Sequence, residues 1–147
     1  MSRNNPKYII IHHAYMNDIQ DGKSLERIQK YHMNKGWKNI GYHYVIEYKD
    51  GVPICRQGRH ETTNGAHTIG FNTKSIGICI VGNYDKHPLE LDKKDLLLKL
   101  LRYLIHAHHI PRTKIIGHRD SYKLRNKPVE KSCPGNKIDL SQLLEDL

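Results

Sequence analysis

Two histidines and one cysteine stand at positions where they could share a metal ion. His12 follows the apolar run KYIII at residues 7–11, and His118 follows a second short apolar run, KIIG, at residues 114–117. Both runs have the length and β-branched content of buried strands, so each histidine is expected where a strand ends. Cys133 lies further along the chain and is followed at once by a proline. Two imidazoles and one thiolate suit zinc, which in catalytic sites takes three protein ligands and leaves a fourth position open.

The spacing of these residues leaves a plainer interpretation open. The chain contains neither an HExxH nor a CxxC motif, and its 11 histidines offer many accidental triplets. Cys133 could be a small buried hydrophobic residue, and His118 an ordinary core or surface histidine. Cys55 and Cys79 fall in predicted strands and are expected to be structural thiols. Spacing alone does not decide between a metal site and a structural cluster.

Helical patterns occupy three parts of the chain. Ser24 is expected to cap a helix that runs to about Lys35. A longer amphipathic helix is predicted from about Asp92 to His109, because aliphatic residues recur there at helical spacing. Residues 139–147 begin with a capping-box pattern and predict a last short helix.

Strand patterns fill the intervening segments. Residues 41–58 predict a β-hairpin that turns at Asp50-Gly51, and the apolar run 75–82 predicts a central strand covered on both faces. Residues 59–74 are polar and turn-rich and are predicted to form a long surface loop. The order strand, helix, hairpin, strand, helix, strand, helix predicts a single α/β domain with a mixed central β-sheet flanked by helices.

The charge balance points to a polyanionic partner. The net charge is +9 and the sequence pI is about 9.5, which would attract nucleic acid, an anionic membrane or a bacterial cell wall. Charge does not choose among these partners, and a solvated basic surface is the plainer alternative. The apolar run near the N-terminus is too short for a signal peptide or a membrane span. We therefore expect synthesis in a cytoplasm, no signal peptide and no membrane insertion.

Five stretches occur in the order found in one protein family. They are IIIHHA (9–14), KGWKNIGYHYVI (35–46), GAHTIGFNTKSIGICIVGNY (65–84), IIGHRD (115–120) and KSCPG (131–135). Together they resemble the zinc N-acetylmuramoyl-L-alanine amidases, which include small phage endolysins of the amidase-lysozyme type and the related peptidoglycan recognition proteins. The resemblance covers nearly the whole chain. It implies the mixed-sheet fold of that family, one zinc ion and bacterial peptidoglycan as the partner.

The resemblance also implies roles for individual residues. His12, His118 and Cys133 match the three zinc ligands of the family. Tyr42 matches its catalytic tyrosine, and Lys131 matches the lysine that phage members use in catalysis. A phenol hydroxyl or a lysine cation can stabilise an oxyanion that develops during attack on an amide. Tyr42 could instead orient or deprotonate the attacking water, and the sequence leaves both roles open.

Four further residues are candidates for substrate contacts. His67 and Asn72 occupy loop positions that resemble the substrate groove of the family. Trp37 could line this groove or close the core. His43 follows Tyr42 and points to the other side of a regular strand, so its alternative is a role behind the substrate surface.

The remaining histidines are expected to have structural roles. His13 alternates to the side opposite His12 and should pack in the core. The smallest phage enzymes can carry a different residue at this position, so the His-His pair looks more like the recognition proteins. The cluster of His106, His108 and His109 should decorate the end of the long helix, where cations suit the helix dipole.

The combined expectation is a monomeric, zinc-dependent amidase of a phage or prophage. It would hydrolyse the bond between N-acetylmuramic acid and L-alanine, with residues 1–147 as a single catalytic domain without a separate cell-wall-binding module. It would be made in the host cytoplasm and act at the cell wall after release.

One alternative is a non-catalytic peptidoglycan-binding protein, although such members typically replace the cysteine that is present here as Cys133. A basic nucleic-acid-binding domain is a weaker alternative, because the chain has no recognition helix or single-strand-binding motif, and no specific nucleic acid partner is expected.

Overall fold

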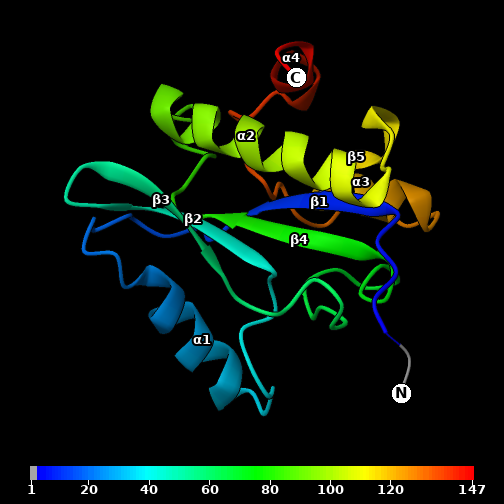
Figure 1. Cartoon of the computed structure of the whole chain (residues 1–147), viewed down its shortest axis with the longest axis horizontal. Coiled ribbons are helices and arrows are strands. Elements are labelled where there is room, and N and C mark those ends of the chain that lie inside the picture. Colours follow the sequence, from blue (N-terminus) through cyan, green and yellow to red (C-terminus); the bar gives the residue numbers. More distant parts are fainter. Residues whose placement is uncertain (1–2) are drawn as a thin grey trace.

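A five-stranded β-sheet forms the centre of the molecule. A computed structural model describes residues 3–147, and its strands are β1 (Tyr8–His13), β2 (Tyr44–Lys49), β3 (Val52–Gln57), β4 (Ser75–Ile80) and β5 (Ile115–Gly117). They lie in the order β3-β2-β4-β1-β5 (Figure 1). β1 is parallel to β4 and β5, and β2 is parallel to β4, whereas β2 and β3 are antiparallel. The predicted mixed α/β sheet is confirmed.

Helices cover both faces of this sheet. They are α1 (Ser24–Asn34), α2 (Leu91–His108), α3 (His118–Leu124) and α4 (Leu140–Glu145), with a short 3-10 turn at Arg112–Lys114. The helices α1 and α2 lie on opposite sides of the sheet (Figure 1). None of the helices in residues 3–147 combines the length and the apolar character that crossing a membrane requires.

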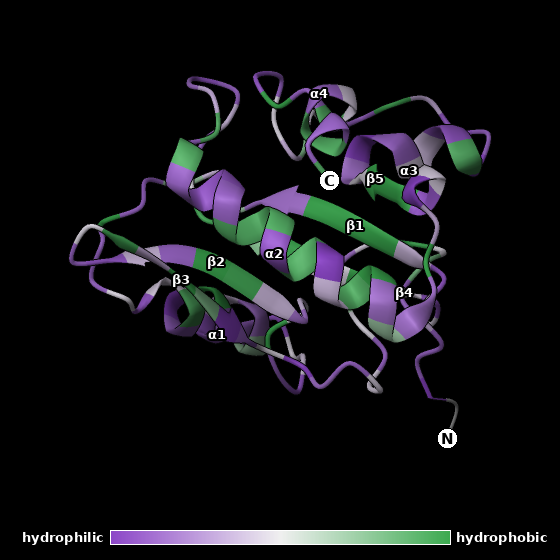
Figure 2. Cartoon of the chain, turned by 45° about the horizontal axis from the view of Figure 1, so that its top comes forward, coloured by the Kyte–Doolittle hydropathy of each residue, from purple (hydrophilic) through white to green (hydrophobic). Residues whose placement is uncertain are grey.

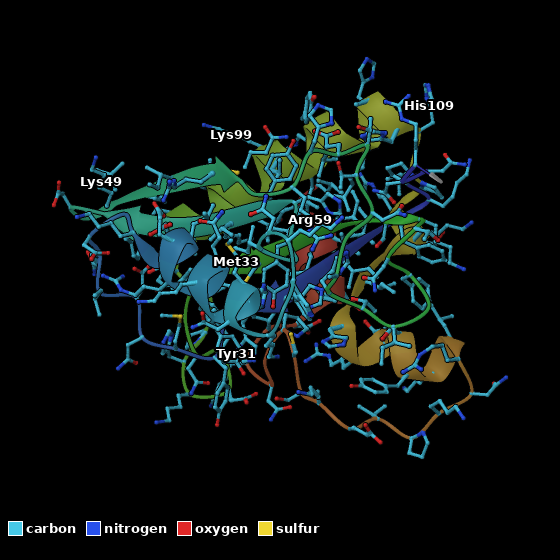
Figure 3. All side chains as sticks on the ribbon, turned by 90° about the horizontal axis from the view of Figure 1, so that it is seen from below. Tyr31, Met33, Lys49, Arg59, Lys99 and His109 are labelled. Carbon is cyan, nitrogen blue, oxygen red and sulfur yellow. The ribbon has the colours of Figure 1, made fainter. Side chains whose placement is uncertain are left out.

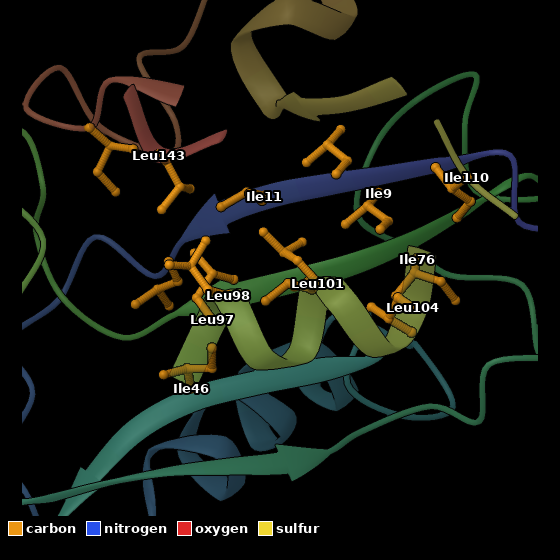
Figure 4. Packing of buried hydrophobic residues seen from close by; sticks show 14 of the residues in the cluster. Ile9, Ile11, Ile46, Ile76, Leu97, Leu98, Leu101, Leu104, Ile110 and Leu143 are labelled. Carbon is orange, nitrogen blue, oxygen red and sulfur yellow. The ribbon is translucent and has the colours of Figure 1, made fainter. Parts of the chain in front are cut away.

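The larger part of the core lies between α2 and the sheet. Leu97, Leu101 and Leu104 recur at helical spacing and are fully buried. They pack in one cluster with Ile9 and Ile11 of β1 (Figure 4). Burying each such side chain contributes about 1.5–3 kcal/mol, so this face supplies much of the stability that holds the strand ends in place.

The opposite face of β1 carries the first candidate ligand. Ile10 packs with Phe71 and Ile116 in a separate cluster, away from α2. Because side chains alternate along a strand, His12 lies on the same face as Ile10. Both faces of β1 are therefore covered, which explains the apolar run of its middle residues 9–11; Figure 2 shows hydrophobic colour over the middle of the strand and hydrophilic colour at its arrowhead.

The hairpin prediction is also confirmed. β2 and β3 are joined at Asp50 and Gly51, whose φ angles are 51° and 78°. Two successive positive φ angles match the right-handed twist of the flanking strands, and Asp-Gly adopts them at low cost.

One local prediction was wrong for an identifiable reason. Ser24 is not the cap of α1, because the N–H groups of Ser24 and Leu25 donate instead to the buried Glu47 carboxylate at 2.9 and 3.1 Å. A side chain from β2 thus provides the cap, which no local pattern signals. His118 lies directly after β5, as predicted, and begins α3, where the Asp120 carboxylate accepts from the Gly117 N–H at 2.8 Å.

Candidate metal and active site

The three candidate metal ligands meet at one edge of the sheet. β1 and β5 are parallel neighbours with Ile11 opposite Gly117, so His12 and His118 leave the same edge side by side. Their ring centroids are 4.7 Å apart. Donor atoms of His12, His118 and Cys133 all lie within 4.8 Å of one another, a separation that a single ion can bridge. Among residues 3–147, this is the one group of three histidine, cysteine or acidic side chains placed in this way.

Arg119 fixes the loop that carries Cys133. Its backbone N–H donates to the Cys133 carbonyl at 2.8 Å, and its guanidinium donates to the carbonyls of Gly135 and Ile138, both at 2.7 Å. The thiol itself is held from β1, where the His13 N–H lies 3.3 Å from the sulfur. The third ligand is thus attached to the first two through both β1 and α3.

Asp85 holds the same loop from the other side. Its carboxylate accepts from the Ser132 hydroxyl at 2.9 Å and from the Asn136 N–H at 2.8 Å. The two bonds flank Cys133 in sequence, so the thiol cannot move far without breaking one of them.

Burial sets the protonation of the two histidine ligands. It lowers the pKa of His12 well below its ordinary value, and the neighbouring His67 and His118 lower it further. Burial, followed by the charges of Lys131 and Arg125, lowers the pKa of His118 to about 4. Both rings are therefore neutral at neutral pH and present free electron pairs. This donor set of two neutral imidazoles and one sulfur fits a zinc ion.

A cleft of about 950 Å³ opens over these residues. Tyr42 and Lys131 line it together with the three candidate ligands, and so do three of the four predicted substrate contacts, Trp37, His67 and Asn72. The structure therefore brings eight of the nine predicted site residues to one cleft.

Tyr42 lies close to His12, with ring centroids 5.0 Å apart. Burial raises the pKa of its phenol well above the ordinary value, so the hydroxyl stays protonated and can donate a hydrogen bond. The preceding residue, Gly41, is fixed at both polar groups: its N–H donates to His32 Nδ1 at 2.9 Å, and its carbonyl accepts from the Ala66 N–H at 3.0 Å. Hydrogen bonds on both sides of Gly41 thus hold the backbone that carries Tyr42 in place.

The structure does not bring His43 into the cleft. This ring is fully buried behind Tyr42, as the alternation of side chains allows. Its Nε2 lies 2.8 Å from the Thr63 carbonyl, and its Nδ1 accepts from the Gly77 N–H at 3.0 Å. His43 joins the loop 58–74 to β4 and makes no surface available to a substrate.

Asn72 and His67 line the cleft but also organise the loop around it. The Asn72 side-chain oxygen accepts from the N–H groups of His67 and Thr68 at 2.8 and 3.0 Å. This segment has no helix or strand, as predicted, yet it is not simply a surface loop, because Thr68 and Phe71 are buried. The loop folds inward and forms one wall of the cleft.

Trp37 forms part of another wall. Its ring lies 4.5 Å from that of His32, and the Lys35 ammonium lies 5.3 Å from its centroid. Tyr31 of α1 extends this wall and is 61% exposed (Figure 3). Sequence reasoning missed His32, although its spacing from Leu25 and Ile28 places it on the inner face of α1.

The other histidines occupy structural positions in this conformation. His13 is buried, and its Nδ1 accepts from the Tyr84 N–H at 3.1 Å. His108 bonds Glu61 at 2.5 Å and so ties the end of α2 to the loop 58–74. His109 caps α2 in a left-handed conformation.

Known proteins share both the sequence pattern and the fold. The family model described as N-acetylmuramoyl-L-alanine amidase matches residues 2–136. The peptidoglycan-recognition protein LB of Drosophila melanogaster is 30% identical over 138 residues, which cover 89% of this chain and 55% of that protein. The endolysin of Escherichia phage T7 is 34% identical over 98 residues, or 58% of this chain and 63% of the endolysin. The chain thus spans less than two thirds of the length of either relative.

A solved structure extends the likeness to nearly all of the chain. The N-acetylmuramoyl-L-alanine amidase LysC from Clostridium intestinale URNW superposes with a TM-score of 0.80 at 30% identity, covering 97% of this chain and 85% of that one. The family model covers the three candidate ligands and Tyr42 in one continuous match. This chain therefore belongs to the N-acetylmuramoyl-L-alanine amidase family.

Proposed function

We propose that this protein is a zinc-dependent N-acetylmuramoyl-L-alanine amidase. It hydrolyses the amide bond between the lactyl group of N-acetylmuramic acid and the first L-alanine of the peptidoglycan stem peptide. The observation that carries the proposal is the convergence of His12, His118 and Cys133 within 4.8 Å, in a cleft that Tyr42 and Lys131 also line. Family membership supports the same reaction class.

The three ligands would hold one zinc ion. When bound, zinc supplies a Lewis acid for the scissile carbonyl and makes a water molecule acidic enough to attack at neutral pH. The chain contributes two neutral imidazoles and a sulfur whose loop is fixed by Arg119 and Asp85. It therefore supplies a prearranged site and not a flexible chelator.

Tyr42 and Lys131 stabilise the negative charge that develops on the carbonyl oxygen during the reaction. Tyr42 keeps its proton because burial raises the pKa of its phenol, so it donates a hydrogen bond to the carbonyl oxygen as that oxygen becomes negative. Lys131 is exposed in the same cleft, and its positive charge already acts on His118 and Cys133. Both groups therefore stabilise the oxyanion as it forms.

The cleft and the net charge suit a cell-wall substrate. Trp37, His67 and Asn72 are available along the cleft walls for an extended ligand. The net charge of +9 attracts polyanionic bacterial walls. The likeness to a phage endolysin further supports a role as an endolysin, made in a host cytoplasm and acting on the wall after release.

A second candidate function is recognition of peptidoglycan without cleavage. It is favoured by the similarity to a peptidoglycan-recognition protein over 89% of the chain. The two functions differ in one observable, because a recognition protein binds the wall and leaves its amide bonds intact.

Metal removal and one substitution test the proposed activity. EDTA should abolish wall cleavage and added zinc should restore it. Cys133→Ser should lose zinc and cleavage together, because a neutral hydroxyl is a poor zinc ligand. Cys55→Ser on β3 is a matched control and should keep both. Undiminished cleavage by metal-free protein would contradict the mechanism, and wall binding without cleavage by zinc-loaded wild type would favour recognition.

A further inference from the structure

A chain of hydrogen bonds leads from His12 away from the metal ligands and into the sheet. His12 Nε2 lies 2.9 Å from His67 Nδ1, and His67 Nε2 lies 3.2 Å from the Ser75 hydroxyl. Ser75 is fully buried at the start of β4, and its hydroxyl donates to the Phe71 carbonyl at 2.8 Å. The chain thus ends on a backbone acceptor.

That backbone acceptor favours one direction for the protons in the chain. A carbonyl can only accept, so the Ser75 proton points to Phe71 and the Ser75 oxygen is left to accept from His67 Nε2–H. A neutral imidazole carries one proton, so His67 Nδ1 is bare and accepts from His12 Nε2–H. His12 then has its free electron pair on Nδ1.

Thr68 is compatible with the same direction. Its hydroxyl oxygen lies 2.9 Å from His67 Nδ1 and 3.2 Å from His12 Nε2. The single lone pair of His67 Nδ1 accepts either from His12 Nε2–H or from the Thr68 hydroxyl, and in the second case the Thr68 oxygen can accept from His12 Nε2–H. In both cases His12 carries its proton on Nε2.

Two glycines make room for the His67 ring. A Cβ added to Gly77 of β4 would lie 2.6 Å from His67 Cδ2, and one added to Gly65 would lie 2.5 Å from the same atom. Ordinary side chains at these positions would push the ring out of place. The backbone is thus shaped around the histidine that contacts His12.

We propose that His67 and Ser75 are positioning residues that hold His12 with its Nδ1 free for the metal ion. This inference rests on the proposed zinc site, and it gives His67 a role in metal binding in addition to its place on the cleft wall. Hydrogen bonds to the outer nitrogen of a ligating histidine fix its tautomer and orientation, and losing them typically lowers metal affinity by about 10–100-fold.

The proposal is tested by zinc affinity and by the protonation of His12. Zinc affinity is measured by competition with a chromophoric chelator for wild type, Ser75→Ala, His67→Leu and His67→Asn. Ser24→Ala is the matched control, because Ser24 is equally buried and its hydroxyl has no hydrogen-bond partner among the described residues. Nitrogen-15 spectra of the metal-free wild type report which nitrogen of His12 carries the proton.

His67→Leu should weaken zinc binding roughly 10–100-fold, Ser75→Ala should weaken it by a smaller factor, and Ser24→Ala should leave it unchanged. His67→Asn should bind more tightly than His67→Leu, because the asparagine oxygen can accept the His12 proton from a similar position. Wild-type affinity in both Ser75→Ala and His67→Leu, or a His12 proton on Nδ1, would overturn the proposal. A wild type that binds zinc but cleaves no peptidoglycan would remove the proposed function and leave these readouts meaningful.

Discussion

At Cys133, burial opposes the chemistry that a zinc ligand needs. Burial raises the pKa of the thiol to about 12, although the His13 N–H and the charge of Lys131 act in the other direction. A thiol with that pKa is protonated at neutral pH and offers no anionic ligand. A bound cation reverses the balance, since a coordinating thiol loses its proton outright. Metal binding at this site should therefore release a proton.

The roles of Tyr42 and Lys131 can be separated from metal binding. Tyr42→Phe and Lys131→Ala should each keep zinc but lower kcat by on the order of 10²- to 10³-fold, because each removes one group that stabilises negative charge. Tyr103→Phe on the exposed face of α2 is the control and should retain wild-type turnover. Steady-state kinetics on soluble muropeptides, with metal content measured in parallel, would decide the matter. Wild-type kcat in both variants would remove their assigned roles.

At the scale of single elements, periodicity predicts most of what holds the site. The apolar runs before His12 and His118 signal two strands, and parallel pairing of those strands places both histidines at one edge of the sheet. Alternation also holds just before β2, where Tyr42 faces the cleft and His43 is buried on the other side. The sequence could not reveal that β1 and β5 are neighbours, because that pairing joins segments far apart in the chain.

Irregular segments cannot be predicted in this way, because their apolar residues do not recur at a regular spacing. The loop 58–74 looks polar and exposed, yet it inserts His67 and Thr68 beside His12. Glu47 of β2 caps α1. Asp85 holds the Cys133 loop through Ser132, which lies 47 residues further along the sequence. These contacts depend on tertiary structure, so the family resemblance, and not any local pattern, pointed to the loop residues.

The contact between α1 and the Tyr42 segment should be sensitive to acid. His32 Nδ1 accepts from the Gly41 N–H, and burial, followed by the charges of Lys35 and Arg59, lowers the pKa of His32 to about 4. In the unfolded chain this pKa returns to about 6.5. Between these values the unfolded state binds the extra proton, so the free energy of unfolding should fall as the pH drops from about 6.5 towards 4.

Urea unfolding at several pH values tests this coupling. His32→Asn keeps an acceptor near the Nδ1 position but cannot gain the proton, so it should lose less stability than wild type over the same pH range. His106→Asn replaces an exposed histidine of α2 and should follow the wild-type curve. Identical pH dependence in His32→Asn and wild type would contradict the assignment.

At the scale of the whole molecule, the fold separates stability from function. The α2 face of the sheet carries the large aliphatic core (Figure 4). The opposite face and the strand ends carry the cleft. The residues that bind and react can therefore be polar without weakening the main core. The net charge of +9 acts over a longer range than any single contact.

Long-range attraction to the wall should depend on salt. The rate of wall lysis should fall as ionic strength rises from about 0.05 to 0.5 M, because the Debye length shortens and screening weakens the encounter. Hydrolysis of a small soluble muropeptide, which carries few charges, should change much less. Turbidity and peptide release under matched conditions measure the two rates. Equal salt dependence for both substrates would show that net charge does not aid encounter with the wall.

The central claim is that a metal bound by His12, His118 and Cys133 cleaves one particular amide bond. Mass spectrometry of purified peptidoglycan digested with zinc-loaded protein, with and without EDTA, tests it most directly. We predict free stem peptides that begin with L-alanine, and glycan strands without peptides, only in the absence of chelator. Intact glycopeptides under both conditions, with the protein retained on the wall, would contradict the account.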